Sequence, residues 1–170
     1  MVKKVKNTAE QPKKKRYLFD IPSLNMSLWV LLDQTRDLVA KARELELHHF
    51  KLTRAQAAIL YILIFENKGL TISEISNWNM REPNSVLSLV NRMEKIGLLK
   101  KTRTPGRDKI VINITEAGSK LYKELTRQSI DMIFSALSEE EKQQFKTCLF
   151  KVRGKSRELL GMDFKPPFLP

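Results

Sequence analysis

Residues 81–103, REPNSVLSLVNRMEKIGLLKKTR, are the segment that most constrains how this chain can fold. Their apolar residues recur at i, i+3, i+4 and i+7, which predicts a helix with one face packed on a core. Pro83 stands in the first turn, where proline is favoured, and Gly97 is placed to end the helix. The apolar positions of this face are Val86, Leu89, Val90 and Met93.

The opposite face of the same predicted helix is polar. Amide and hydroxyl side chains can donate to and accept from base edges in the DNA major groove, and a helix N-terminus attracts phosphate. We therefore expect this face to contact DNA. The candidate DNA-contacting residues are Arg81, Asn84, Ser85, Leu87, Ser88, Asn91 and Arg92.

Two short β-type runs, 98–103 and 109–114, follow this helix, and Pro105-Gly106 predicts the turn between them. A hairpin directly after such a helix is typical of a wing. Cations on a thin hairpin can enter a narrow minor groove or hold the DNA backbone. The candidate wing cations are Lys101, Arg103, Arg107 and Lys109, with Lys100 beside them.

The rest of the chain is predicted to be helical. Ser23 begins a long helix with a coiled-coil-like apolar stripe, Thr53 begins a nearly all-apolar helix, and Thr71 with Glu74 forms a capping box for a short helix to about Trp78. That short helix, a turn and the helix from Pro83 have the layout of a helix-turn-helix.

After the hairpin, we expect one helix from Thr115 to about Leu137 and a last helix that begins at Ser138 with Glu141. The apolar stripes of the first, fifth and sixth helices exceed what a small central lobe can cover. A two-fold homodimer would bury them and would set two DNA-contacting helices about one DNA turn apart.

Charge and composition agree with a nucleic-acid partner. The chain has 170 residues and a net charge of +12. The electrostatic field of such a positive chain favours the binding of polyanions. Residues 1–20 form a basic arm, which could be either a solubilising tail or a phosphate-binding arm.

Cys148 is the only cysteine, which excludes an intramolecular disulfide and cysteine-built metal sites. We expect a cytoplasmic protein without membrane spans, since no apolar run is long enough for one.

Four blocks of the sequence resemble the multiple-antibiotic-resistance regulator (MarR) family of winged helix-turn-helix proteins: LTRAQAAILYIL, LTISEIS, SVLSLVNRMEKIGLLKK and INITEAGSKL. The resemblance implies a mainly α fold with a small β-hairpin wing, and a dimeric transcription regulator, most often a repressor, that is released by a small effector. The implied divisions are a basic arm (1–20), an N-terminal dimerisation helix (21–52), a winged helix-turn-helix lobe (53–115), C-terminal dimerisation helices (116–162) and a tail (163–170).

The chain departs from the family at the wing, which is shorter. Gly106 and Asp108 stand where the family commonly has Asp and Arg, so Arg107 or Lys109 is the expected minor-groove cation. Leu87 and Ser88 stand where a hydroxyl and a cation are usual. A leucine would touch a thymine methyl group and make no polar contact, so the preferred operator is left open.

The effector site implied by the resemblance lies between the dimerisation helices and the lobe. Each candidate also has a simpler interpretation, because aromatic and methionine side chains at helical spacing are usually core residues. Adjacent histidines on a helix diverge by about 100° and no cysteine joins them, so we expect no metal at this pair. We expect no cofactor either. The candidate effector-binding residues are Met26, Trp29, His48, His49, Tyr61 and Phe65.

Two other classes of function are a docking module and an enzyme. A winged helix can be a protein-protein docking module, but the wing cations weigh against it, because docking surfaces are depleted in lysine at their centre. The sequence offers no support for an enzyme, since it has no phosphate loop and no nucleophile-base spacing, and therefore no candidate catalytic residue.

Overall fold

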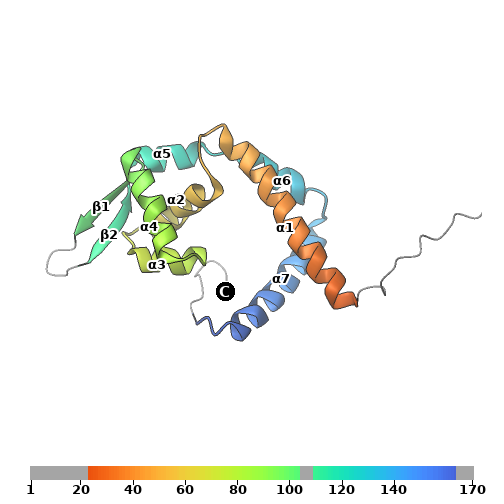
Figure 1. Cartoon of the computed structure of the whole chain (residues 1–170). Helices are drawn as coiled ribbons and strands as arrows, with labels where there is room; N and C mark the ends of the chain where they lie inside the picture. Colours follow the sequence, from red (N-terminus) through yellow and green to blue (C-terminus); the bar gives the residue numbers. More distant parts are fainter. Residues whose placement is uncertain (1–22, 104–108, 164–170) are drawn as a thin grey trace, which may run out of the picture. The chain divides into compact units, whose positions relative to one another are not determined.

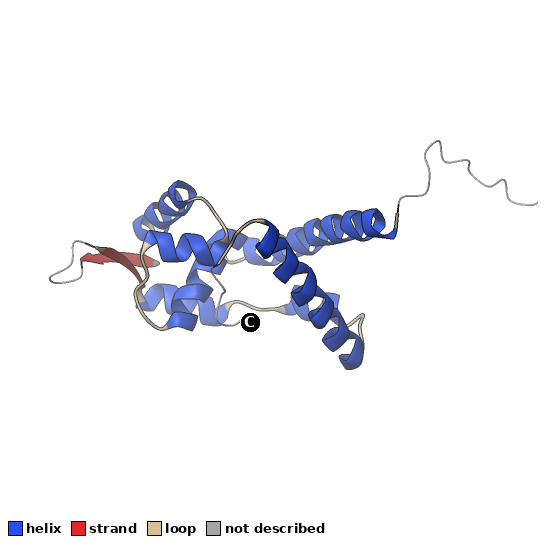
Figure 2. Cartoon of the chain, turned by 90° about the horizontal axis from the view of Figure 1, so that it is seen from below, coloured by secondary structure: helices blue, strands red, loops and turns tan. Residues whose placement is uncertain are grey.

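The computed structural model describes residues 23–103 and 109–163. The expected basic arm, the wing tip with Arg107, and the tail from residue 164 lie outside the described residues. The elements, in chain order, are α1 (Leu24–His48), α2 (Arg54–Glu66), α3 (Ile72–Asn79), α4 (Pro83–Lys95), β1 (Leu99–Arg103), β2 (Ile110–Ile114), α5 (Glu116–Glu124), α6 (Gln128–Phe134) and α7 (Glu139–Leu159) (Figure 1). The expected mainly α fold with one β-hairpin is confirmed, as the colouring by secondary structure makes plain (Figure 2).

The chain divides into two compact units, one up to Arg36 and one from Asp37 onward. The described part of the first unit is the first half of α1. Its leucines Leu24, Leu28 and Leu31 are exposed. The second unit contains the rest of α1 and all the other elements.

The core of the second unit is built around α2. This helix is apolar on nearly all sides, and Ile59, Leu60 and Leu63 are almost completely buried. Helices α3, α4 and α5 and strand β2 all contact α2. The α4 residues predicted to face the core, Val86, Leu89, Val90 and Met93, are all buried. The helical periodicity therefore identified the inner face of α4 correctly.

Local capping sets the starts of three helices. Thr53 with Gln56, Thr71 with Glu74, and Ser138 with Glu141 each form a reciprocal capping box. In each box the hydroxyl accepts from the backbone N–H three residues on, and the longer side chain accepts from the capping residue. The three predicted helix starts are confirmed.

The end of α4 is a Schellman turn. Gly97 has a φ of 77°, the Gly97 N–H donates to the Glu94 carbonyl at 2.9 Å, and the Leu98 N–H donates to the Met93 carbonyl at 2.9 Å. A positive φ is easy only for glycine, so Gly97 both ends the helix and directs the chain into the wing.

In the wing, β1 and β2 pair antiparallel, with Leu99 opposite Ile114 and Lys101 opposite Ile112. Leu70, between α2 and α3, extends this pairing. Its N–H donates to the Ile112 carbonyl at 3.0 Å and its carbonyl accepts from the Ile112 N–H at 2.7 Å. The base of the wing is thereby joined to the start of the helix-turn-helix.

The prediction of a single helix from Thr115 to about Leu137 is wrong. The structure has two helices, α5 and α6, and between them Leu125 is extended, with φ −63° and ψ 121°. The Glu46 carboxylate, on α1, accepts hydrogen bonds from the backbone N–H groups of Gln128 and Ser129 at 2.9 and 3.2 Å. These donors belong to the first turn of α6, so a side chain distant in sequence caps a separate helix.

Candidate nucleic-acid interface

The turn between α3 and α4 sets the direction in which α4 begins. Met80 has a φ of 49°, and the Arg81 N–H donates to the Ser76 carbonyl at 3.1 Å. Ser76 is buried, and its hydroxyl donates back to the Arg81 carbonyl. This reciprocal pair holds the turn while leaving the side chain of Arg81 exposed.

The outer face of α4 is open. Arg81, Asn84, Ser85, Leu87, Ser88 and Arg92 are all exposed, whereas Asn91 is half-buried. Part of this face forms a shallow hollow of about 450 Å³, and its lining is mostly polar. The residues that line the hollow are Arg81, Asn84, Ser85, Ser88, Leu89 and Arg92. The structure thus brings most of the predicted α4 residues together on one accessible surface.

The wing cations differ from one another. Lys100, Arg103 and Lys109 are exposed, whereas Lys101 is half-buried. The Lys101 ammonium donates to Asn91 Oδ1 at 2.6 Å and lies 2.7 Å from Glu94 Oε2. Its hydrogen bond lowers the pKa of the Glu94 carboxyl below the ordinary value. Lys101 is therefore engaged by α4 within the chain itself.

The predicted effector residues lie in both units of the chain. Met26 and Trp29 are exposed on the first half of α1, and His48 and His49 are exposed at its end. Tyr61 packs between two rings, 5.9 Å from Phe65 and 6.2 Å from Tyr122 between centroids. Burial, and then the neighbouring Tyr122, raises the pKa of Tyr61. Phe65 packs edge-on against Trp78 at 5.8 Å.

Of these six residues, His49 lines a hollow of about 490 Å³ beside the start of α6. Glu46 lines the same hollow and has the most perturbed carboxyl among the described residues. Partial burial raises its pKa, but hydrogen bonds from Ser129, Thr126 and Arg43 outweigh this and lower the pKa to about 2. The Arg43 guanidinium also donates to the Thr126 carbonyl at 2.7 Å.

Sequence reasoning did not identify Glu46, Arg43 or Glu94. Glu46 and Arg43 act through residues about 80 positions away, so no local pattern marks them. Glu94 gave a weak signal, because it lies one helical turn after Asn91. In the described ranges, 23–103 and 109–163, no group of three His, Cys, Asp or Glu side chains is arranged to hold a metal ion. Over the same ranges no helix has the length and apolar character needed to cross a membrane.

We compared the chain with known protein families, curated proteins and solved structures. No protein-family model and no curated protein matches the sequence. Solved structures do match. The ligand-free organohalide-sensing RdhR transcriptional regulator is 25% identical, with a TM-score of 0.74 over 89% of this chain and 99% of that one. A MarR-family transcriptional regulator from Rhodococcus sp. RHA1 is 20% identical, with a TM-score of 0.69 over 76% of this chain and 94% of that one.

A third match is a mutant MarR from E. coli complexed with operator DNA, 16% identical, with a TM-score of 0.70 over 75% of this chain and 94% of that one. The chain has the winged helix-turn-helix fold of these solved structures. In this chain α3 and α4 form the helix-turn-helix, and β1 and β2 form the wing. These structural neighbours are transcription regulators.

Within this fold, the candidate nucleic-acid interface is the outer face of α4 together with the exposed wing cations. The two parts are adjacent because the Schellman turn at Gly97 leads directly from α4 into β1. One accessible surface therefore combines hydrogen-bonding side chains with positive charge.

Proposed function

We propose that this chain is a MarR-type DNA-binding transcriptional regulator, a dimeric repressor of nearby genes that binds a pseudo-palindromic operator and is released by a small effector. One observation carries the proposal: the outer face of α4 exposes amide, hydroxyl and guanidinium groups beside a basic hairpin. Base edges in the major groove accept and donate to such groups, and the phosphates on either side attract the cations.

The solved structures support this reading. The mutant MarR from E. coli and MepR from S. aureus were each crystallised with DNA. RdhR was crystallised with 2,4-dichlorophenol, and CouR with p-coumaroyl-CoA. The direct DNA contacts proposed for this chain are Arg81, Asn84, Ser85, Leu87, Ser88, Arg92, Arg103, Arg107 and Lys109, with Asn91 as a further reader.

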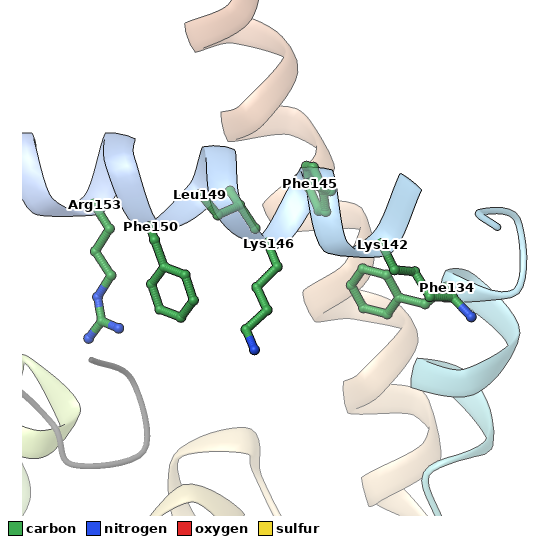
Figure 3. Close-up of a pocket in the computed structure, with 7 residues that line it drawn as sticks. All are labelled: Phe134, Lys142, Phe145, Lys146, Leu149, Phe150 and Arg153. Atoms are coloured by element: carbon green, nitrogen blue, oxygen red, sulfur yellow. The ribbon is translucent and has the colours of Figure 1, made fainter. Parts of the chain in front are cut away.

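A second copy of the chain is the proposed partner of the apolar stripe on α7. Phe145, Leu149 and Val152 are exposed on this helix. Phe145 and Leu149, together with Phe150, Phe134 of α6 and three cations, border an open hollow of about 520 Å³. Figure 3 shows this hollow from the side, with Lys146, Phe150 and Arg153 extending in one direction from α7. Apolar surface of this kind gains free energy when a partner covers it. We propose residues 21–52 and 116–162 as the dimerisation regions and 53–115 as the DNA-binding lobe.

We propose that the protein has no catalytic role and acts in the cytoplasm, where the DNA is. The effector site is proposed to include His49, which lines the hollow beside α6. The other proposed members are Met26, Trp29, His48, Tyr61 and Phe65.

The experiment that tests the proposal measures binding to the DNA that flanks the gene itself, at several salt concentrations. A regulator is expected to bind one duplex at least about 1,000-fold more tightly than scrambled DNA of the same length. Its affinity is expected to fall steeply with salt, because each neutralised phosphate releases counterions. Equal affinity for all duplexes, or no binding in dilute buffer, would favour a docking module instead.

A further inference from the structure

Lys101 lies on the inner face of the wing. Along β1, Leu99 is buried and Lys101 half-buried, whereas Lys100 and Thr102, between and after them, are exposed. Alternate residues of a strand point to opposite faces, so Lys101 shares the face of Leu99. The cross-strand partner of Lys101 is Ile112, which is completely buried. The Lys101 ammonium is thus directed toward the helical body of the lobe.

There it contacts two residues of α4 that are one helical turn apart. Its nitrogen lies 2.6 Å from Asn91 Oδ1 and 2.7 Å from Glu94 Oε2. The side chains of Lys101 and Glu94 are 28% and 38% exposed, so solvent only partly screens the pair. We name Asn91, Glu94 and Lys101 the α4–wing clamp. Glu94 holds the ammonium in place, and the ammonium holds the Asn91 amide.

The clamp defines which end of the Asn91 amide faces outward. An ammonium group can only donate hydrogen bonds, so the group directed at Lys101 must be the amide oxygen. The amide NH₂ is left for another partner. Within residues 23–103 and 109–163, no group accepts a hydrogen bond from it. Asn91 is therefore presented as a donor.

Resting on the proposed DNA-binding function, we propose that Lys101 is a positioning residue that sets how Asn91 reads a base, by holding the amide oxygen toward the wing and the NH₂ toward DNA. An NH₂ donor matches the acceptors of the major groove, which are guanine O6 and N7, adenine N7 and thymine O4. Two-point pairing with adenine also needs the oxygen to accept from the adenine amino group, and the ammonium already uses one of the two lone pairs of that oxygen.

The clamp separates Lys101 from its neighbour Lys100. The side chain of Lys100 is exposed on the outer face of β1 and makes no hydrogen bond or ion pair with any described residue. A cation of that kind interacts with phosphates regardless of sequence. The two adjacent lysines therefore carry the same charge but are expected to have different effects on DNA binding, which makes Lys100 the matched control.

The test selects binding sites from a random duplex library with four proteins: wild type, Lys101→Met, Lys101→Arg and Lys100→Met. Lys101→Met is expected to reduce the base preference at one position of each half-site by at least about fivefold, since one base contact provides that much discrimination. Lys101→Arg keeps a donor and is expected to retain the preference. Lys100→Met is expected to weaken all sites alike and to lower the salt slope by about one unit.

A measurement without DNA accompanies the selection. Lys101→Met is expected to raise the pKa of the Glu94 carboxyl, followed by NMR, and to shift the Asn91 side-chain NH₂ resonances, whereas Lys100→Met leaves both unchanged. A Lys101→Met variant that loses affinity uniformly with a lower salt slope would overturn the proposal, because Lys101 would then be a phosphate contact. Wild-type protein that binds no duplex would instead reject the proposed function, and the positioning role with it.

Discussion

Glu46 joins the last turns of α1 to the start of α6. Its carboxylate accepts hydrogen bonds from Arg43 at 2.6 Å, from the Thr126 hydroxyl, and from the backbone and hydroxyl of Ser129. Its side chain is only 12% exposed. A carboxylate with this many donors is stabilised in its charged form, and that stabilisation depends on the fold.

Glu46→Gln is expected to lower the free energy of unfolding at neutral pH by about 1 to 3 kcal/mol, because charge-assisted hydrogen bonds at a helix start are lost. The pKa of Glu46 falls from 4.5 to about 2 on folding, so its contribution is present above about pH 4.5 and is lost as pH falls toward 2. The difference between wild type and variant, measured by urea unfolding from pH 7 to pH 3, should therefore shrink below about pH 4.5.

Glu158→Gln is the control for Glu46. Glu158 pairs with Lys155 at 2.6 Å, but both side chains are about two-thirds exposed. Exposed pairs of this kind contribute about 0 to 1 kcal/mol. If Glu46→Gln proves no more destabilising than Glu158→Gln, the junction between α1 and α6 does not depend on the Glu46 charge.

At the scale of elements, the sequence predicted the helix starts that depend on neighbouring residues. It did not predict the helix break that depends on a residue far along the chain. The capping boxes at Thr53, Thr71 and Ser138 depend on residues three positions apart, so the sequence displays them. The break in the helix after α5 depends on Glu46, about 80 residues away. No pattern of apolar residues around Thr126 predicts this break. The contacts between Lys101 and α4 were missed because they cross the turn at Gly97, which neither the helical nor the strand period spans.

Packing between α5 and the wing provides a further prediction. A Cβ at Gly118, in the first turn of α5, would clash with the Leu98 carbonyl oxygen and lie 3.0 Å from Ile114 Cγ1. Backbone cannot move aside easily, so Gly118→Ala is expected to lower the unfolding free energy by more than about 1 kcal/mol. Gly154→Ala, on α7 with nothing within 4 Å, should raise it by about 0.5 to 1 kcal/mol.

Thermal or urea unfolding of the two alanine variants separates helix propensity from packing. Both changes place alanine in a helix, so propensity alone would make both variants more stable. Opposite signs would show that close contact with the wing dominates at Gly118. A stable Gly118→Ala variant would mean that α5 can move away from the Leu98 backbone, just before β1, without cost.

At the scale of the whole molecule, the polar α4 face and the winged-helix fold could be predicted from the sequence, because helical periodicity separates the buried Val86 and Val90 from the exposed Asn84 and Ser88. The apolar stripe of α7 was also predicted. Its partner was not, because a sequence shows that a face is apolar but does not show what covers it. In the structure Phe145 is 40% exposed and Val152 52% exposed.

A charge on this stripe should therefore prevent dimerisation. Phe145→Asp would bury an unpaired carboxylate in the proposed interface, so the variant is expected to be monomeric when examined by sedimentation equilibrium. Its affinity for a full palindromic site should fall by about 100-fold or more, since the second half-site no longer adds binding energy, whereas affinity for a single half-site should be unchanged. Thr147→Asp is the control, because Thr147 is exposed two residues away, on the far side of the helix. Wild-type protein that sediments as a monomer, or a Phe145→Asp variant that remains dimeric, would remove α7 from the interface.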